Sequence, residues 1–234
     1  MTLLYSECYK LRKQPDKQEV NRVMSETENP AAAQRSKGRP RGFDRVQALT
    51  RALDVFWRRG YEIASVSELC TAMGINPPSL YAAFGNKAKL FLEAVDFYES
   101  TYWGETWQAL ESEADVHQAI ADFFEAASHI LLSPDAPCGC LVALAATNVS
   151  AESVEVGQAI GELRLLGKMN FVQRLERAVK EGQLPPDTDV ASLGAALNTM
   201  LEGLSIQARD GLTVSEMSRL AAHAVRLLPR RPAH

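Results

Sequence analysis

Residues 65–84 of this 234-residue chain read SVSELCTAMGINPPSLYAAF, which predicts two short helices joined by a tight turn. Ser65 and Glu68 have the spacing of a capping box, so the first helix begins directly after Ser65. Apolar residues follow at positions 66, 69, 70 and 73, which share one face of a helix. Gly74 supplies the positive φ that ends this helix, and Asn76 can cap the next one.

Two short helices joined by a glycine-containing turn are typical of the helix-turn-helix, which presents its second helix to the DNA major groove. Pro77 and Pro78 suit the first turn of that second helix, where a missing N–H costs no hydrogen bond. A helical hairpin that only packs a core would show the same pattern. The flanking sequence has to separate these two interpretations.

The flanking sequence is strongly basic and favours DNA. Residues 35–59 contain eight basic and two acidic residues, a net charge of +6, whereas the whole chain carries −4. A positive patch on an acidic protein is the electrostatic pattern of a phosphate-binding surface. Arg51 or Arg58 alone could belong to a solvated helix face. Arg39 and Arg41, within Gly-Arg-Pro-Arg-Gly, better suit an arm along the DNA backbone or in the minor groove.

The composition excludes several classes of protein. Apolar residues make up 46% of the chain and charged residues 23%, as in globular domains. No apolar run approaches the roughly 18 residues of a membrane span, and we expect no secretory segment at the start. Four cysteines do not make a disulfide framework for a chain of this size. We therefore expect a cytoplasmic protein.

The chain divides into three predicted regions. Residues 1–37 are polar and lack sustained periodicity, so we expect a disordered extension. Met24 offers a second possible start of translation, which would make residues 1–23 dispensable. Residues 38–86 are predicted to form the helix-turn-helix domain, with a first helix from about Asp44 to Arg59.

Residues 87–230 are predicted to form a second domain of six helices. Strands are not expected there, because the alternation of apolar and polar residues that is typical of strands is essentially absent. The first of these helices begins near Lys87 and spans about 18 residues. The others are predicted over about residues 115–133, 138–149, 152–182, 188–209 and 213–228. The fold class is therefore all-α, with a three-helix head followed by a six-helix body.

Several residues at fixed spacing resemble the DNA-binding domain of the tetracycline-repressor (TetR) family of regulators. They are Gly60-Tyr61-Glu62, Ser65-Val66, Ala72-Met73-Gly74-Ile75, Ser79-Leu80-Tyr81, Phe84 and Lys87. This resemblance covers about residues 39–92, and the C-terminal half resembles the family only in architecture. It implies a homodimer whose body binds a small effector and releases double-stranded DNA when that effector is bound.

The resemblance also implies phosphate contacts by Tyr81 and Lys87, and a backbone or base contact by Ser79. The full set of candidate DNA-binding residues is Arg39, Arg41, Ser65, Asn76, Pro77, Pro78, Ser79, Tyr81, Ala82 and Lys87. Many family members carry polar or basic residues at positions 77, 78, 82 and 83, where this chain has proline and alanine. Contacts with thymine methyl groups and DNA shape should therefore contribute more to specificity. Leu80 and Phe84 are expected in the core.

Two further surfaces are expected in the body. Apolar stripes in the last two helices predict a dimer interface, although about half of these residues could face the subunit's own core. The candidates are Leu193, Leu197, Leu201, Leu204, Leu220 and Ala224. A two-fold dimer predicts a palindromic operator. The candidates for an effector pocket, each of which could be ordinary core, are Trp103, Trp107, Phe123, Cys140, Asn148 and Phe171.

Three alternatives remain open. Cys138 and Cys140, with His117 or His129, could bind a soft metal such as Cu(I) or sense oxidants, although free cysteines are also common in cores. The local motifs of hydrolases and nucleotide-binding enzymes are missing, so no catalytic residue or cofactor is assigned and an enzyme is not expected. An all-helical protein-interaction adaptor is the third class, which the basic arm and Lys87 disfavour.

Overall fold

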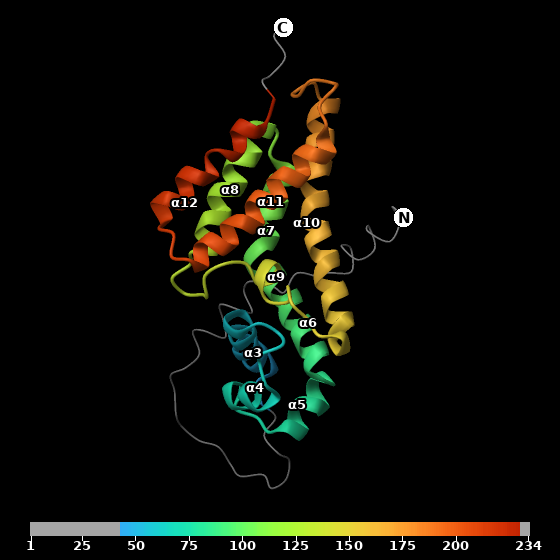
Figure 1. The fold of residues 1–234 in the computed structure, drawn as a ribbon, viewed down its shortest axis with the longest axis vertical. Helices are drawn as coiled ribbons and strands as arrows, with labels where there is room; N and C mark the ends of the chain where they lie inside the picture. The colour runs from blue at the N-terminus through green and yellow to red at the C-terminus, as the bar shows by residue number, and fades with distance from the viewer. Residues whose placement is uncertain (1–42, 230–234) are drawn as a thin grey trace, which may run out of the picture. The chain divides into compact units, whose positions relative to one another are not determined.

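The structure is a computed structural model that describes residues 43–229. The predictions about residues 1–37, Met24, Arg39 and Arg41 lie outside these residues. Every regular element in the described part of the chain is helical, as expected for an all-α protein (Figure 1). None of the helices between residues 43 and 229 is long and apolar enough to cross a membrane.

Three short helices form the first part, called the head below. They are α3 (Arg45–Arg59), α4 (Val66–Met73) and α5 (Pro77–Phe84). Asp44 caps α3 by accepting the backbone N–H of Gln47 at 3.0 Å. Gly60 ends α3 with a φ of 76°, a conformation that glycine adopts without steric cost.

The remaining helices form the body. α6 (Lys87–Tyr98) continues through a π-helical segment (Glu99–Trp103) into α7 (Gly104–Ser112), as Figure 1 shows in green. The next two helices are α8 (Val116–Leu131) and the four-residue α9 (Leu141–Leu144). A 3-10 turn (Ala151–Ser153) then leads to α10 (Val154–Lys180), α11 (Val190–Arg209), α12 (Val214–Ala221) and a last 3-10 turn (Ala224–Leu227).

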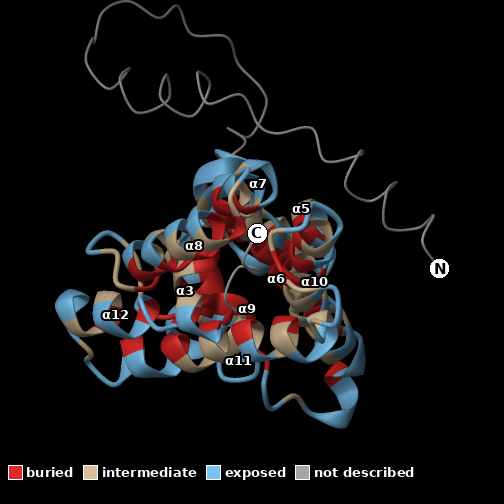
Figure 2. Cartoon of the chain, turned by 90° about the horizontal axis from the view of Figure 1, so that it is seen from above, coloured by how far each residue is buried: buried red, intermediate tan, exposed pale blue. Residues whose placement is uncertain are grey.

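A continuous hydrophobic core joins the head to the body. Phe56 of α3 meets Phe91 of α6 edge to face, with ring centroids 5.0 Å apart. Trp57 meets Tyr98 in the same way at 4.6 Å, and all four side chains are buried. Figure 2 shows the buried residues on the faces that the helices turn toward one another. Burying one such ring contributes about 2–3 kcal/mol, so these contacts fix α3 on α6.

The helix predicted over residues 138–149 is wrong in length, because α9 spans only Leu141–Leu144. Gly139 lies before it with a φ of 84°, outside the helical region. Beyond it, the carbonyl of Ala145 accepts the backbone N–H of Tyr61 at 2.8 Å. The helix therefore ends at Leu144, and the next carbonyl along the chain bonds to the head.

Two other predicted boundaries need correction. The last predicted helix, over residues 213–228, ends as α12 at Ala221 and resumes only as a 3-10 turn. The helix that begins at Lys87 does not stop near residue 104, because the π-helical segment leads it into α7. The described body therefore has more helical segments than the six expected.

Candidate DNA-binding surface

The caps of α4 and α5 lie where the sequence predicts them, but Glu68 pairs with Arg59 and does not complete the predicted capping box with Ser65. The Ser65 hydroxyl accepts the backbone N–H of Glu68 at 3.1 Å, and Asn76 Oδ1 accepts that of Ser79 at 2.9 Å. Gly74 ends α4 in the left-handed conformation, with a φ of 70° and a ψ of 30°. These caps satisfy N–H groups that a helix end leaves unpaired, so local residues define the motif.

One face of α5 is buried and the other is exposed. Leu80 and Phe84 are 0% and 5% exposed, which confirms that they belong to the core. Ser79 is half-buried. The exposed face carries Pro77, Pro78, Tyr81 and Ala82. This face therefore offers apolar groups and one phenol, a surface suited to methyl contacts more than to bidentate hydrogen bonds with bases.

Two exposed cations flank α5. Arg51, on α3, extends to the α4–α5 turn, where a Cβ added to Gly74 would lie 3.5 Å from its Nη1. Lys89, on α6, lies beside the end of α5, where a Cβ added to Gly85 would lie 3.0 Å from its Cδ. Neither cation has an acidic partner among residues 43–229. Neither residue is among the candidates predicted from the sequence, because the charge of a residue alone does not show whether it has an acidic partner.

The other arginines of α3 have acidic partners. The pairs are Arg45 with Glu93, Arg58 with Asp54 at 3.0 Å, and Arg59 with Glu68 at 3.4 Å. The Arg45 guanidinium also lies over the ring of Phe84, 4.5 Å from its centroid. These pairs compensate part of the positive charge counted in the sequence, so the cations available to phosphate are fewer than that count suggests.

Lys87 opens α6, but its ammonium group contacts the protein. Its Nζ donates to the carbonyl of Glu62 at 3.2 Å and lies 4.5 Å from the centroid of the Tyr61 ring. Burial lowers the pKa of Lys87, while the Glu62 carboxylate acts in the opposite direction. An ammonium group has three N–H donors, so Lys87 can keep this bond and also donate to a phosphate. The phosphate contact of Lys87 stays a prediction.

Comparison with known proteins identifies the family of this chain. The family model described as bacterial regulatory proteins, tetR family, matches residues 48–94, and a tetracyclin repressor-like C-terminal domain matches residues 117–224. The transcriptional repressor ComR of Escherichia coli is 33% identical over 204 residues, which cover 87% of this chain and 97% of ComR. The chain belongs to the TetR family.

Two other relatives extend the comparison. YezE of Bacillus subtilis, described as an uncharacterized HTH-type transcriptional regulator, is 30% identical over 187 residues, 80% of this chain and 95% of YezE. A cysteine mutant of the TetR-family regulator CifR, solved with 26-bp operator DNA, is 39% identical with a TM-score of 0.79. That match covers 82% of this chain and 100% of CifR. This TetR-family chain is therefore a DNA-binding transcriptional regulator and not an enzyme.

The aromatic residues considered for an effector pocket gather in the body of this TetR-family protein. The Phe123 ring lies 4.5 Å from that of Trp107, 4.9 Å from that of Phe171 and 6.3 Å from that of Trp103. Trp103, Phe123 and Phe171 are almost fully buried, and only Trp107 is partly exposed. Their rings pack against one another as core. Asn148 is exposed in the segment after α9.

The two neighbouring cysteines lie in different environments. Cys138 is exposed, whereas Cys140 is buried and its pKa is raised to about 11, mainly by burial. The imidazoles of His117 and His129 lie near the carboxylates of Asp115 and Glu125. No group of three or more metal-binding side chains occurs within residues 43–229. A buried thiol with a raised pKa is a poor metal ligand and a slow nucleophile, which disfavours the sensor interpretation.

Four of the six residues predicted at the dimer interface lie inside the subunit instead. They are Leu197, Leu201, Leu204 and Ala224, which are at most 7% exposed. The reason is the orientation of α11 about its axis. Its leucine stripe faces the core of its own subunit. Leu193 is half-buried, and Leu220 remains 39% exposed. The outward side of α11 carries small residues together with Ile206, which is 51% exposed.

The segment around α9 connects the head with α11. The indole N–H of Trp57 donates to the carbonyl of Gly139 at 2.9 Å inside the core. The guanidinium of Arg209, at the end of α11, donates to the carbonyls of Trp57 and Cys138. The backbone N–H of Ser150 donates to the Glu62 carboxylate at 2.7 Å. A change in the packing of the body therefore has a hydrogen-bonded path to the head.

Proposed function

We propose that this TetR-family regulator is a homodimeric repressor that binds a palindromic operator through α5 and leaves it when the body binds an effector. Its head would comprise residues 38–86, its body residues 87–230, and it would act in the cytoplasm. The observation that carries the DNA-binding part is the exposed face of α5 between Arg51 and Lys89, two cations without an acidic partner in the described part of the chain. A protein adaptor has no need of this arrangement.

The chemistry of α5 favours a particular mode of operator recognition. Pro77, Pro78 and Ala82 can contact thymine methyl groups, while Tyr81, 50% exposed, can donate to a phosphate. Arg51 and Lys89 would contact phosphates on either side of the groove that α5 enters. Phosphate contacts fix the register without reading sequence, so specificity would come from methyl groups and DNA shape.

The dimer part rests on apolar surface that the described chain leaves uncovered. Ile206 of α11, Leu220 of α12 and Leu165 of α10 are 51%, 39% and 55% exposed. A Cβ added to Gly203 would meet nothing within 4 Å, so a partner helix could approach α11 closely there. Relatives named as repressors, ComR among them, support the repressor role.

Selection from a library of random 30-bp duplexes tests the proposed function. We expect the full-length protein to enrich a palindrome with two half-sites about one helical turn or a multiple of it apart. Bound fraction should fall steeply as salt rises, because phosphate contacts release counterions. Enrichment of a single unrepeated site, or of no site, would contradict the proposal.

A further inference from the structure

A groove lies between α7 and α8, which form a helical hairpin. Its volume is about 420 Å³, within the range of small-molecule sites. Its apolar lining consists of Ala109, Leu110, Ala119, Phe123 and Ala126. Three of these five are alanines, whose short side chains leave between the two helices the space that larger residues would fill.

The rim of the groove is acidic. Glu105, Glu113 and Asp122 line it, and no basic side chain does so among the described residues. Asp122 is exposed, and its carboxylate accepts one hydrogen bond, from the Gln118 side chain at 2.7 Å. Carboxylates around an apolar floor create a negative potential that attracts a cation attached to an apolar body.

Thr106 provides a second, independent observation. This residue is only 9% exposed and lines the groove, yet its hydroxyl has no hydrogen-bond partner within residues 43–229. Thr50 and Thr71, also on helices, donate to the carbonyls four residues earlier, at 3.0 and 2.9 Å. The hydroxyl oxygen is not among the fully buried side-chain atoms that lack a partner, so solvent reaches it and a ligand can hydrogen-bond to Thr106 Oγ1 in place of water.

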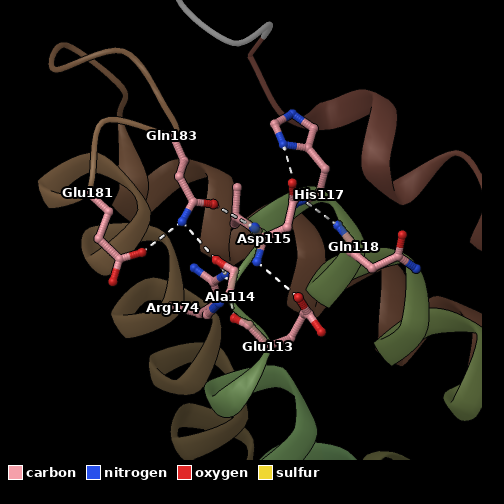
Figure 3. A network of polar contacts seen from close by, with 9 residues as sticks. Glu113, Ala114, Asp115, His117, Gln118, Arg174, Glu181 and Gln183 are labelled. Carbon is pink, nitrogen blue, oxygen red and sulfur yellow. Dashed lines mark hydrogen bonds and ion pairs between the residues drawn. The ribbon is translucent and has the colours of Figure 1, made fainter.

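The turn between α7 and α8 is held in place by α10 and by the segment that follows it, as Figure 3 shows. The Arg174 guanidinium donates to the carbonyls of Glu113 and Ala114 at 3.0 and 3.1 Å. The Gln183 amide donates to the carbonyl of Ala114 at 2.8 Å and accepts the N–H of Val116 at 2.7 Å. The α7–α8 turn is thus fixed before any ligand binds. Because Arg174 lies behind that turn, a ligand's cation is best placed near Asp122 and Thr106.

We propose that this groove binds an ammonium ion carried on an aromatic or alkyl body. The ammonium donates hydrogen bonds to the Asp122 carboxylate and to Thr106 Oγ1. The apolar body lies against Ala109 and Ala126, because Leu110 and Phe123 are only 2% exposed. This inference rests on the proposed function, since it names the chemical class of the effector.

Calorimetry on the DNA-free, full-length protein tests this with three probes of the same shape. They are 4-phenylbutylammonium, the neutral 4-phenylbutanol and the anionic 5-phenylpentanoate. We expect the ammonium ion to bind at least about tenfold more tightly than either other probe, because charge attraction and the Thr106 hydrogen bond favour it. Equal binding of the three probes, or a preference for the carboxylate, would overturn the proposal.

Substitutions locate the site. Asp122→Asn should weaken ammonium binding by about tenfold and leave phenylbutanol binding unchanged. Glu125→Gln is the matched control, since Glu125 lies on α8 outside the groove and should have no effect. Thr106→Val should weaken ammonium binding by about threefold without lowering the melting temperature. Equal effects of Asp122→Asn and Glu125→Gln would overturn the proposal. Because DNA is absent, failure here leaves operator binding untouched, and loss of operator binding alone would contradict only the proposed function.

Discussion

Arg51 and Arg58 lie seven residues apart on α3, but within residues 43–229 only Arg58 has an acidic partner, Asp54. An ion pair already satisfies the guanidinium of Arg58, whereas that of Arg51 is available to a phosphate. Glu93, the partner of Arg45, is 48 residues away in sequence. The sequence therefore shows which residues are charged but not which charges are compensated, and only the fold separates these arginines.

Arg51→Ala should weaken binding to every duplex and reduce the slope of log K against log salt by about 0.9, the effect of one lost phosphate contact. Arg58→Ala is the control and should leave the slope unchanged. Fluorescence anisotropy between about 50 and 200 mM salt measures both. Equal slopes for Arg51→Ala and the unmodified protein would remove Arg51 from the proposed interface.

Cys138 and Cys140 should differ sharply in reactivity. With a pKa of about 11, Cys140 has roughly a thousandth of its molecules as thiolate at pH 8, and its sulfur is buried. Iodoacetamide should therefore alkylate Cys138 first, as peptide mass spectrometry would show. In denaturant the two should react alike. Equal rates in the folded protein would mean that Cys140 is accessible, and would restore the thiol-sensor alternative.

At the scale of the elements, the helix-turn-helix was predictable because its signals are local. Ser65, Gly74 and Asn76 fix the ends of α4 and α5 through bonds to residues three or four positions away. The length of α9 was not predictable, because the carbonyl that follows it bonds to Tyr61 in the head, far away in sequence. The leucine stripe of α11 looks the same whether it faces its own core or a partner, so sequence could not assign it.

Gly139, before α9, should tolerate substitution worse than Gly211, which also has a positive φ. A Cβ on Gly139 would lie 2.7 Å from the Ser205 carbonyl oxygen and from Leu144 Cδ1, whereas one on Gly211 would meet nothing within 4 Å. Gly211→Ala should therefore cost only backbone strain, about 1–2 kcal/mol. Gly139→Ala should cost about 1–3 kcal/mol more, because the added methyl clashes. Denaturant unfolding measures the free energy of unfolding of both variants. Equal losses would mean that the segment before α9 moves to accommodate the added methyl group.

At the scale of the whole molecule, the exposed apolar side chains of α10, α11 and α12 predict self-association. Ile206→Glu should convert the dimer to a monomer near 25.7 kDa in sedimentation equilibrium, because it places a charge in an apolar interface. Ile63→Glu is the control, since Ile63 is 67% exposed in the head. A dimer that survives Ile206→Glu would place the interface elsewhere.

The most direct test of the central claim is the spacing of the two half-sites in the selected palindrome. Two rigidly linked heads must meet major grooves on one side of the duplex, so the distance between half-sites is fixed. Inserting 5 bp turns one half-site by about half a helical turn. Affinity measured by fluorescence anisotropy should then fall about 100-fold or more, toward that of a single half-site. Unchanged affinity after the insertion would contradict a two-fold dimer that reads a palindrome through its α5 helices.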